Sequence, residues 1–196
     1  FHKYIKHHSA DKEHLVERVG LLAIILLGES IISLSRGISD VSWTTDTIIT
    51  ASLGFALLCM IWWIYFDSFE FLVESKKDPN GTTILYSQLF TYMALAVLAN
   101  MIGHAILNDL SIGEFRFMAI TGMVLFYLGK QTAYIVNIPE YRWHNLRNTI
   151  VVLTISSLSL LLDNPQYILM GMCFSMAVYI GMNYQSQIKL YGKANL

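Results

Sequence analysis

The sequence predicts an all-α fold, a polytopic transmembrane helical bundle of about six spans, and three observations carry that prediction. Apolar residues make up 55% of the 196-residue chain and charged residues only 14%, whereas soluble domains carry about a quarter charged residues. The apolar residues gather into six stretches, and the basic residues gather in alternate segments between them. A bilayer core about 30 Å thick needs about 20 apolar residues in a helix.

In chain order, we expect spans near residues 16–35, 47–70, 84–107, 115–138, 146–162 and 166–184. The fifth span is short, so it would be buried among its neighbours or thin the bilayer locally. Helices are expected because each satisfies its own backbone polar groups without water. A transmembrane barrel would alternate with period two, which these apolar runs do not. The whole of residues 1–196 is expected to form a single transmembrane helical domain.

Basic residues indicate how the spans run. One set of connecting segments carries only Arg36 and Arg116, and the other carries ten basic residues. The ten are Lys3, Lys6, Lys12, Arg18, Lys76, Lys77, Arg142, Arg147, Lys189 and Lys193. By the positive-inside rule, both termini of this segment are predicted to be cytoplasmic, in a multi-pass protein of the cell (inner or plasma) membrane. The lipid bilayer is thus the expected partner, and no nucleic acid is expected.

Glu29 is the first ionisable residue that falls well inside a span. It lies about 16 Å beyond Arg18 along the helix, and it shares a stripe with Ser33 and Arg36. Because a carboxylate exposed to lipid is costly, we expect Glu29 to face the helix bundle. Two interpretations stay open: a proton or cation site, or a structural partner for a polar group of another helix.

The second span ends with residues typical of a membrane boundary, Trp62, Trp63 and Tyr65. Asp67 follows them and shares a helical face with Glu70 and Glu74. This acidic face could pair with Arg18, bind a hard cation through its oxygen atoms, or form a solvated helix end.

The third span carries a polar residue at nearly every fourth position, and this stripe should either line a water-filled path or bind another helix. Its members are Gln88, Tyr92, Ala96, Asn100, His104 and Asn108. His104 should lie toward the outer side, either hydrogen-bonded or as a ligand. The sequence shows no metal-binding spacing around it, and no cofactor can be named.

Lys130 lies in the inner half of the fourth span. Its long aliphatic side chain could carry the amino group toward the cytoplasm. Alternatively, it could form an ion pair with Glu29 or Asp67, and we favour an ion pair. The last two spans are expected to serve packing. Within them, Gly171 and Ser175 have the spacing of a close helix contact.

Three blocks in the first half of the chain resemble a known family. Residues 14–21 read H-L-V-E-R-V-G-L, residues 24–30 read I-I-L-L-G-E-S, and residues 62–67 read W-W-I-Y-F-D. This order resembles the bacterial low-temperature-requirement protein A (LtrA) family, with the blocks at 86–88 and 103–105 resembling its next helix. Gln88 stands where the family commonly has histidine. The matching positions are His14, Glu17, Arg18, Gly28, Glu29, Trp62, Trp63, Tyr65, Asp67 and His104.

The resemblance implies an integral membrane protein associated with growth in the cold, and it carries over no catalytic residue. Family members are usually about twice as long, so this chain resembles their C-terminal half. Preceding helices or a second copy are therefore possible partners.

The leading functional hypothesis is a transporter or channel for protons, ions or a small solute. It predicts that Glu29, Asp67, Asn100, His104 and Lys130 converge on one internal cavity. Two alternatives stay open. An intramembrane enzyme that modifies lipid could use histidine and carboxylates as acid and base, and a non-catalytic scaffold or sensor needed in the cold is compatible with the same sequence. An enzyme is the less favoured reading.

Overall fold

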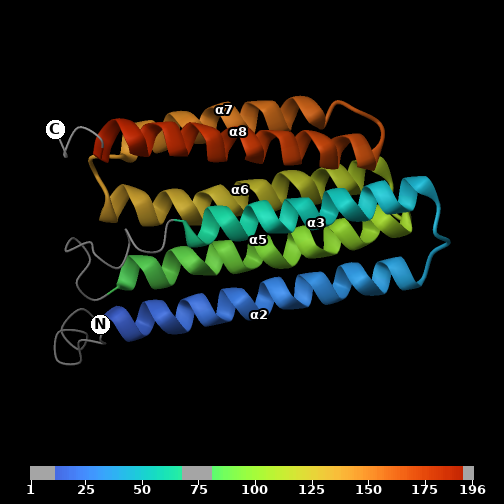
Figure 1. Cartoon of the computed structure of the whole chain (residues 1–196), viewed down its shortest axis with the longest axis horizontal. Coiled ribbons are helices and arrows are strands. Elements are labelled where there is room, and N and C mark those ends of the chain that lie inside the picture. Colours follow the sequence, from blue (N-terminus) through green and yellow to red (C-terminus); the bar gives the residue numbers. More distant parts are fainter. Residues whose placement is uncertain (1–11, 68–80, 192–196) are drawn as a thin grey trace.

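Six helices account for most of the chain that the structure describes. The computed structural model describes residues 12–67 and 81–191, with side chains for 14–67 and 81–185. The helices are α2 (Lys12–Ser39), α3 (Thr45–Phe66), α5 (Thr82–Leu107), α6 (Ile112–Asn137), α7 (Arg142–Ser159) and α8 (Pro165–Tyr191) (Figure 1). No strand occurs in these ranges. The all-α prediction is confirmed, and each predicted span overlaps one helix; residues 68–70 of the second span lie outside the described residues.

Several helices begin or end at residues suited to caps. The Thr44 side chain accepts a backbone hydrogen bond at the start of α3, and Ser111 forms a capping box with Glu114 at the start of α6. Gly81 precedes α5 with φ 65°, and Asn108 ends it with φ 52°. Glycine and asparagine tolerate this left-handed backbone better than other residues do.

The helices form a ring in the order α2, α5, α6, α7, α8 and α3, and α3 packs back on α2 to close it. Figure 1 shows their long axes roughly aligned, with the start of α2 and the end of α8 at the same end of the bundle. Helix α3 also contacts α5 across the ring, so the ring encloses no open pore.

Apolar side chains fill the middle of the ring. Leu57 of α3, Leu98 and Met101 of α5, and Met172 and Met176 of α8 are almost completely buried in one continuous cluster. These side chains come from helices that are distant in sequence. The cluster therefore joins both halves of the chain into one core.

Close contacts between helices depend on small residues. A Cβ atom at Gly129 of α6 would overlap the backbone of α5, and a Cβ atom at Gly171 of α8 would overlap Ser159 of α7. One turn beyond, the buried Ser175 shares a 2.7 Å hydrogen bond with Ser156 of α7. The predicted close contact at Gly171 and Ser175 is therefore confirmed.

Four of the helices, α3, α5, α6 and α8, are long and apolar enough to cross a membrane. Their outward faces carry large apolar side chains such as Phe117, which is 71% exposed. Helices α2 and α7 are not among the four. Helix α2 contains Glu29 and Arg36, and α7 is only 18 residues long and begins with Arg142. Both nevertheless lie alongside the other helices (Figure 1).

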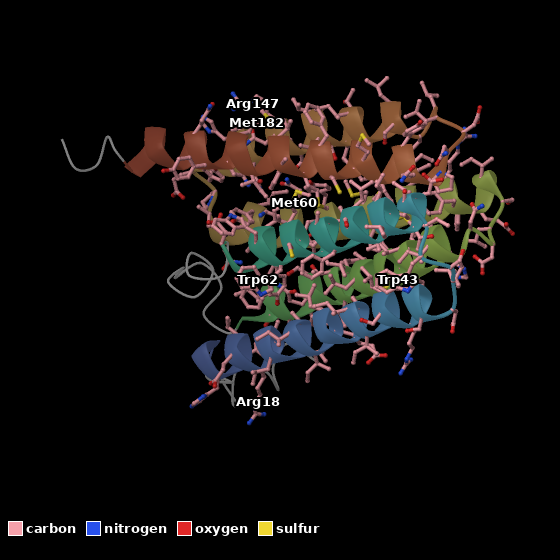
Figure 2. All side chains as sticks on the ribbon, turned by 45° about the vertical axis from the view of Figure 1, so that its right-hand side comes forward. Arg18, Trp43, Met60, Trp62, Arg147 and Met182 are labelled. Atoms are coloured by element: carbon pink, nitrogen blue, oxygen red, sulfur yellow. The ribbon has the colours of Figure 1, made fainter. Side chains whose placement is uncertain are left out.

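The tryptophans mark both ends of the bundle. Trp43, Trp62, Trp63 and Trp143 are all exposed, and Figure 2 shows Trp43 and Trp62 toward opposite ends. Tryptophan favours the boundary between membrane and water, so this arrangement suits a bundle that spans a bilayer.

Candidate functional site

Lys130 is a basic side chain held inside the helix bundle. Helix α6 places it toward the end of the ring that holds the start of α2 and the end of α8 (Figure 1), and it is only 9% exposed. Its ammonium group donates a 3.2 Å hydrogen bond to the carbonyl of Ile64 on α3. It also lies 5.2 and 5.0 Å from the ring centres of Tyr134 and Tyr179. Aromatic faces attract cations, so groups from three helices surround this one amino group.

A carboxylate acts on this cation from the end of α3. Asp67 caps the C-terminus of α3, is exposed, and interacts electrostatically with Lys130. Of the two carboxylates expected to pair with Lys130, the structure thus brings Asp67 near it. The cation is buried and its counter-charge is open to solvent.

Gln131, the next residue of α6, joins that helix to α7. Its amide nitrogen donates to the carbonyl of Asn145 at 3.2 Å and to the hydroxyl of Thr149, and its oxygen accepts from the Asn145 amide at 3.3 Å. The hydroxyl of Tyr179 on α8 donates to Asn145 at 2.6 Å. All four side chains are buried. Asn145 is therefore the centre of a network that joins α6, α7 and α8.

A second set of bonds extends this network toward the end of the bundle. Asn148 of α7 donates to the side-chain oxygen of Asn183 on α8 at 2.9 Å. Arg147 donates to Asn148 at 3.2 Å, and Tyr141 donates to the carbonyl of Asn183 at 3.3 Å. We call the connected side chains the inner polar cluster; it comprises Lys130, Gln131, Tyr134, Tyr141, Asn145, Asn148, Thr149, Tyr179 and Asn183.

Tyr127 adds a hydroxyl group beside this cluster. Its ring packs edge-on against Tyr179, with the centroids 5.2 Å apart, and it is 1% exposed. Its hydroxyl has no hydrogen-bond partner within the described part of the chain. Leaving such a group unpaired costs about 1–3 kcal/mol, so the position suits a water molecule or a polar atom of a ligand.

The opposite end of the ring holds a polar cavity of about 460 Å³ between α3, α5 and α8. Gln166 of α8 donates across it to the carbonyl of Asp46 on α3 at 3.4 Å. Its other polar lining residues include Thr47, Thr50, Asn108, Asn164 and Tyr167. We call this space the outer cavity, because it lies at the end of the bundle predicted to face outside the cell. The apolar core separates it from the inner polar cluster.

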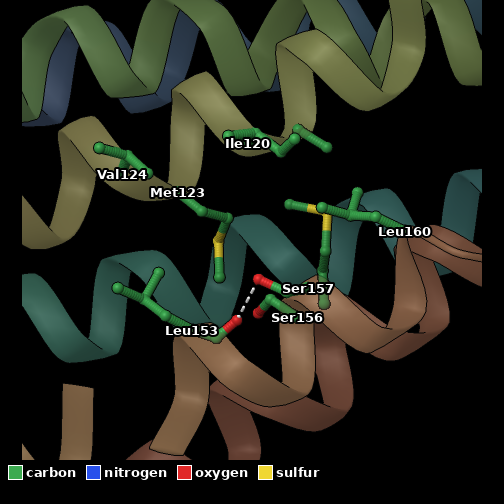
Figure 3. A pocket seen from close by; sticks show the side chains of 9 residues that line it. Ile120, Met123, Val124, Leu153, Ser156, Ser157 and Leu160 are labelled. Carbon is green, nitrogen blue, oxygen red and sulfur yellow. Dashed lines mark hydrogen bonds between the residues drawn. The ribbon is translucent and has the colours of Figure 1, made fainter. Parts of the chain in front are cut away.

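A much smaller crevice of about 30 Å³ lies between α6, α7 and α8 (Figure 3). Met123, Leu153 and Leu160 line it. Its hydroxyl groups are bonded within the protein, since Ser157 donates to the carbonyl of Leu153 at 2.7 Å and Ser156 bonds to α8. The crevice therefore offers mainly apolar surface.

The expectation that Glu29 faces the bundle is wrong for these six helices. Glu29 is exposed, and α2 instead packs inward through Val19, Ala23, Leu27 and Leu34. A helix can bury only the stripe that faces its neighbours, and α2 turns its apolar and small residues to α5 and α3. The carboxylate consequently lies on the outer surface of the bundle.

Asn100 and His104 also lie away from the inner polar cluster. Asn100 is exposed, and its amide donates to the carbonyl of Ala96 on its own helix. His104 is partly exposed at the end of α5, opposite the end that holds Lys130, and its ring lies 2.8 Å from Asp109. A spacing of four residues turns about 40° per step around a helix, so the stripe that begins inside at Gln88 ends outside. The five predicted path residues therefore do not share one cavity.

The residues that carried the family resemblance lie mostly at one end. His14 and Glu17 form an exposed contact of 3.7 Å near the start of α2, and Arg18 projects from the same region (Figure 2). Trp62, Trp63 and the buried Tyr65 lie near the end of α3, whereas Gly28 faces open space in the middle of α2. The two blocks at 14–18 and 62–67 thus share the end that holds the inner polar cluster.

Sequence reasoning missed most of this cluster. Asn148 and Thr149 of α7, with Tyr179 and Asn183 of α8, come from the two spans expected only to pack, and Asn145 lies one residue before the first of these spans. A signal was present, because the three residues of α7 recur at spacings of three and four and so share one helical face. The low hydropathy of this short span was the mark of a polar interface inside the bundle.

No group of three metal-binding side chains occurs in residues 12–67 and 81–191. Glu70 and Glu74, which with Asp67 formed the acidic face considered for a hard cation, lie outside the described residues.

Comparison with known proteins gives the chain its family. It matches the sequence model of the bacterial low temperature requirement A protein (LtrA) over residues 2–182. It is also 29% identical over 128 residues to an uncharacterized protein of Rhizobium meliloti (strain 1021), and this match covers 61% of the chain and 31% of that relative. No solved structure matches. The apolar helices and the family match show an integral membrane protein, and the chain belongs to the bacterial low temperature requirement A family.

Proposed function

We propose that this protein is a membrane transporter for protons, ions or a small solute, and that the inner polar cluster is part of its path. The observation that carries the proposal is Lys130, a cation held inside the bundle by groups of three helices. Ionisable side chains within membrane-spanning helices are costly, and they often mark the path of an ion or substrate.

The distribution of polar groups supports a path that is closed in its middle. Helix α3 contributes Thr50 to the outer cavity and the carbonyl of Ile64 to the inner polar cluster, two levels about 21 Å apart by helical rise. Helix α8 likewise contributes Gln166 to the cavity and Tyr179 to the cluster. Between these levels lies the apolar core. A shift of α3 and α8 against α5 and α6 would open the path toward the outer cavity in one state and toward the inner polar cluster in the other.

Lys130 and Asp67 provide a way to couple events at the exposed end of the path to a change at the buried amino group. Asp67 is exposed at what we predict to be the cytoplasmic end, where solvent and dissolved ions can reach it. A cation bound to Asp67 would weaken its attraction for Lys130, and the ammonium group would then be freer to hold an anion or to move. The unpaired hydroxyl of Tyr127 lies beside Tyr179 and gives a further polar contact along this route.

Flux measurements in proteoliposomes of the full-length protein test the proposal. Lys130→Met removes the charge while keeping the side-chain length, and we expect it to reduce flux at least tenfold. Asp67→Asn removes the counter-charge of Lys130 and should also reduce flux, though by less than Lys130→Met. Arg142→Gln is the matched control, because Arg142 is a basic residue at the same end but is exposed and stacked on Trp143. Unchanged flux in Lys130→Met, at equal amounts of folded protein, would contradict the proposal.

The lipid-modifying enzyme receives less support from the same geometry. That hypothesis needs a cavity of head-group size that contains His104 or Asp67. The outer cavity of about 460 Å³ is large enough, but its lining residues include neither of them.

A further inference from the structure

The outer face of α2 differs from the other outward faces in the described part of the bundle. Ile24, Ile25 and Ile32 are exposed on it, as an apolar face in a membrane would be. Glu29 is exposed among them, and Gly28 beside it has nothing within contact distance. The outward stripe of α6 provides a comparison, because Phe117, Ile120, Val124 and Leu128 form it without a charged residue.

Glu29 lies deep in the membrane, so exposure of its carboxylate to lipid is unfavourable. It lies 10 residues before the end of α2 at Ser39, or about 15 Å by helical rise, which is near the middle of a bilayer core about 30 Å thick. A carboxylate facing hydrocarbon there has no hydrogen-bond donors from water or lipid tails. Within the described residues no side chain supplies a bond to Glu29 that would replace them.

We propose that the α2 outer face is the docking surface for a further transmembrane helix that carries a lysine or arginine at the depth of Glu29. Charge complementarity selects this occupant, because a basic side chain satisfies the carboxylate that lipid cannot. Gly28 allows the backbone of the arriving helix to approach closely. The isoleucines on both sides of Glu29 would pack against its apolar residues.

A second copy of this chain suits the face less well. Two copies in one membrane share an orientation, so a twofold axis beside α2 would place each residue next to its own counterpart. Glu29 would then meet Glu29, and Arg36, on the same stripe, would meet Arg36. Like charges at close range in a membrane are unfavourable.

Spin labels can measure what covers this face in the full-length protein reconstituted in liposomes. With Cys59 and Cys173 replaced by alanine, a label is placed either at Ile32 on α2 or at Val124 on α6. Both residues are 47% exposed in the structure, so the pair is matched. We expect collisions with dissolved oxygen, which concentrates in lipid, to be at least threefold fewer at position 32 than at position 124.

Three results would overturn the proposal. Equal oxygen collisions at the two positions would mean that lipid covers α2. Frequent collisions with a water-soluble nickel chelate at position 32 would mean that the face lines water. Dipolar broadening between singly labelled copies at position 32 would identify the occupant as a second copy.

Substitutions at Glu29 test the charge of the partner separately. If the occupant is basic, Glu29→Lys places like charges together and should reduce the yield of assembled protein at least threefold below that of Glu29→Gln. Glu29→Gln keeps a hydrogen-bonding side chain and is the control for loss of charge alone. Equal yields of the two variants would rule out a basic partner.

Discussion

The inner polar cluster and the outer face of α2 both place a charge at membrane depth, and they treat it in opposite ways. Lys130 is enclosed by a backbone carbonyl, two tyrosine rings and the field of Asp67. Glu29 lies on the surface among isoleucines. The first charge is satisfied by the six helices themselves, whereas the second needs something beyond them.

This difference separates two roles that polar residues have in membrane proteins. A buried polar group that is fully bonded holds helices together and can also serve a path. A polar group on the outward surface contributes nothing to the packing of its own bundle. Substitutions at matched positions of the two regions should therefore have unequal effects on stability.

Reversing the charge at position 130 should have the largest effect. Lys130→Glu would place a carboxylate against the Ile64 carbonyl, two ring faces and the field of Asp67. We expect the free energy of unfolding to fall by about 3–5 kcal/mol, the cost of an uncompensated buried charge. Thermal unfolding in detergent measures this, with Arg142→Glu as an exposed control that should change stability by less than about 0.5 kcal/mol. Similar losses in both variants would mean that Lys130 is not held as the structure shows.

Two asparagines test the comparison without changing charge. Asn145→Leu removes the bonds that join Gln131 and Tyr179 through one buried side chain, and it should lower stability by about 1–3 kcal/mol. Asn100→Leu removes only a bond to its own helix at an exposed position, so its effect should be near zero or slightly stabilising. The same unfolding assay separates them, and a larger loss for Asn100→Leu would invert the comparison.

Two tyrosines inside the bundle give a finer test. The hydroxyl of Tyr179 donates to Asn145 at 2.6 Å, so Tyr179→Phe should cost about 1 kcal/mol, the value of one hydrogen bond. Tyr127 packs against the same ring, and its hydroxyl has no partner among the described residues. Tyr127→Phe should therefore leave stability unchanged or raise it slightly. If Tyr127→Phe proves as costly as Tyr179→Phe, an ordered water or another group must bind the Tyr127 hydroxyl.

The sequence was enough to predict the helical architecture, because membrane helices are set by runs of apolar residues, which are a local feature. It was also enough to identify Lys130 and Asp67 as possible partners. It failed for Glu29 because the cost of exposing a carboxylate to lipid does not by itself decide which face of α2 packs on the other five helices. With a further helix docked on α2, as proposed, the six helices would not have to satisfy that cost alone.

The polar residues of α7 and α8 were missed for a different reason. Asn145 and Asn183 are 38 positions apart in the sequence, and each looks like an isolated polar residue. Their importance depends on the contacts of α6 with α7 and of α7 with α8. Hydrogen bonds between helices require the order of helices around the ring, which periodicity within one helix does not give.

The smallest effect is expected from neutralising Glu29 in the flux assay. This measurement decides whether the outer face of α2 and the inner polar cluster are functionally separate. Glu29 lies on the outside of α2, and the inner polar cluster is built by α3, α6, α7 and α8. Glu29→Gln should therefore keep at least half of the wild-type flux per folded protein, while Lys130→Met loses it. If both variants lose flux equally, the path of the transported species includes the outer face of α2. That result would place Glu29 and Lys130 in one mechanism, with the docked helix forming the other wall of the path.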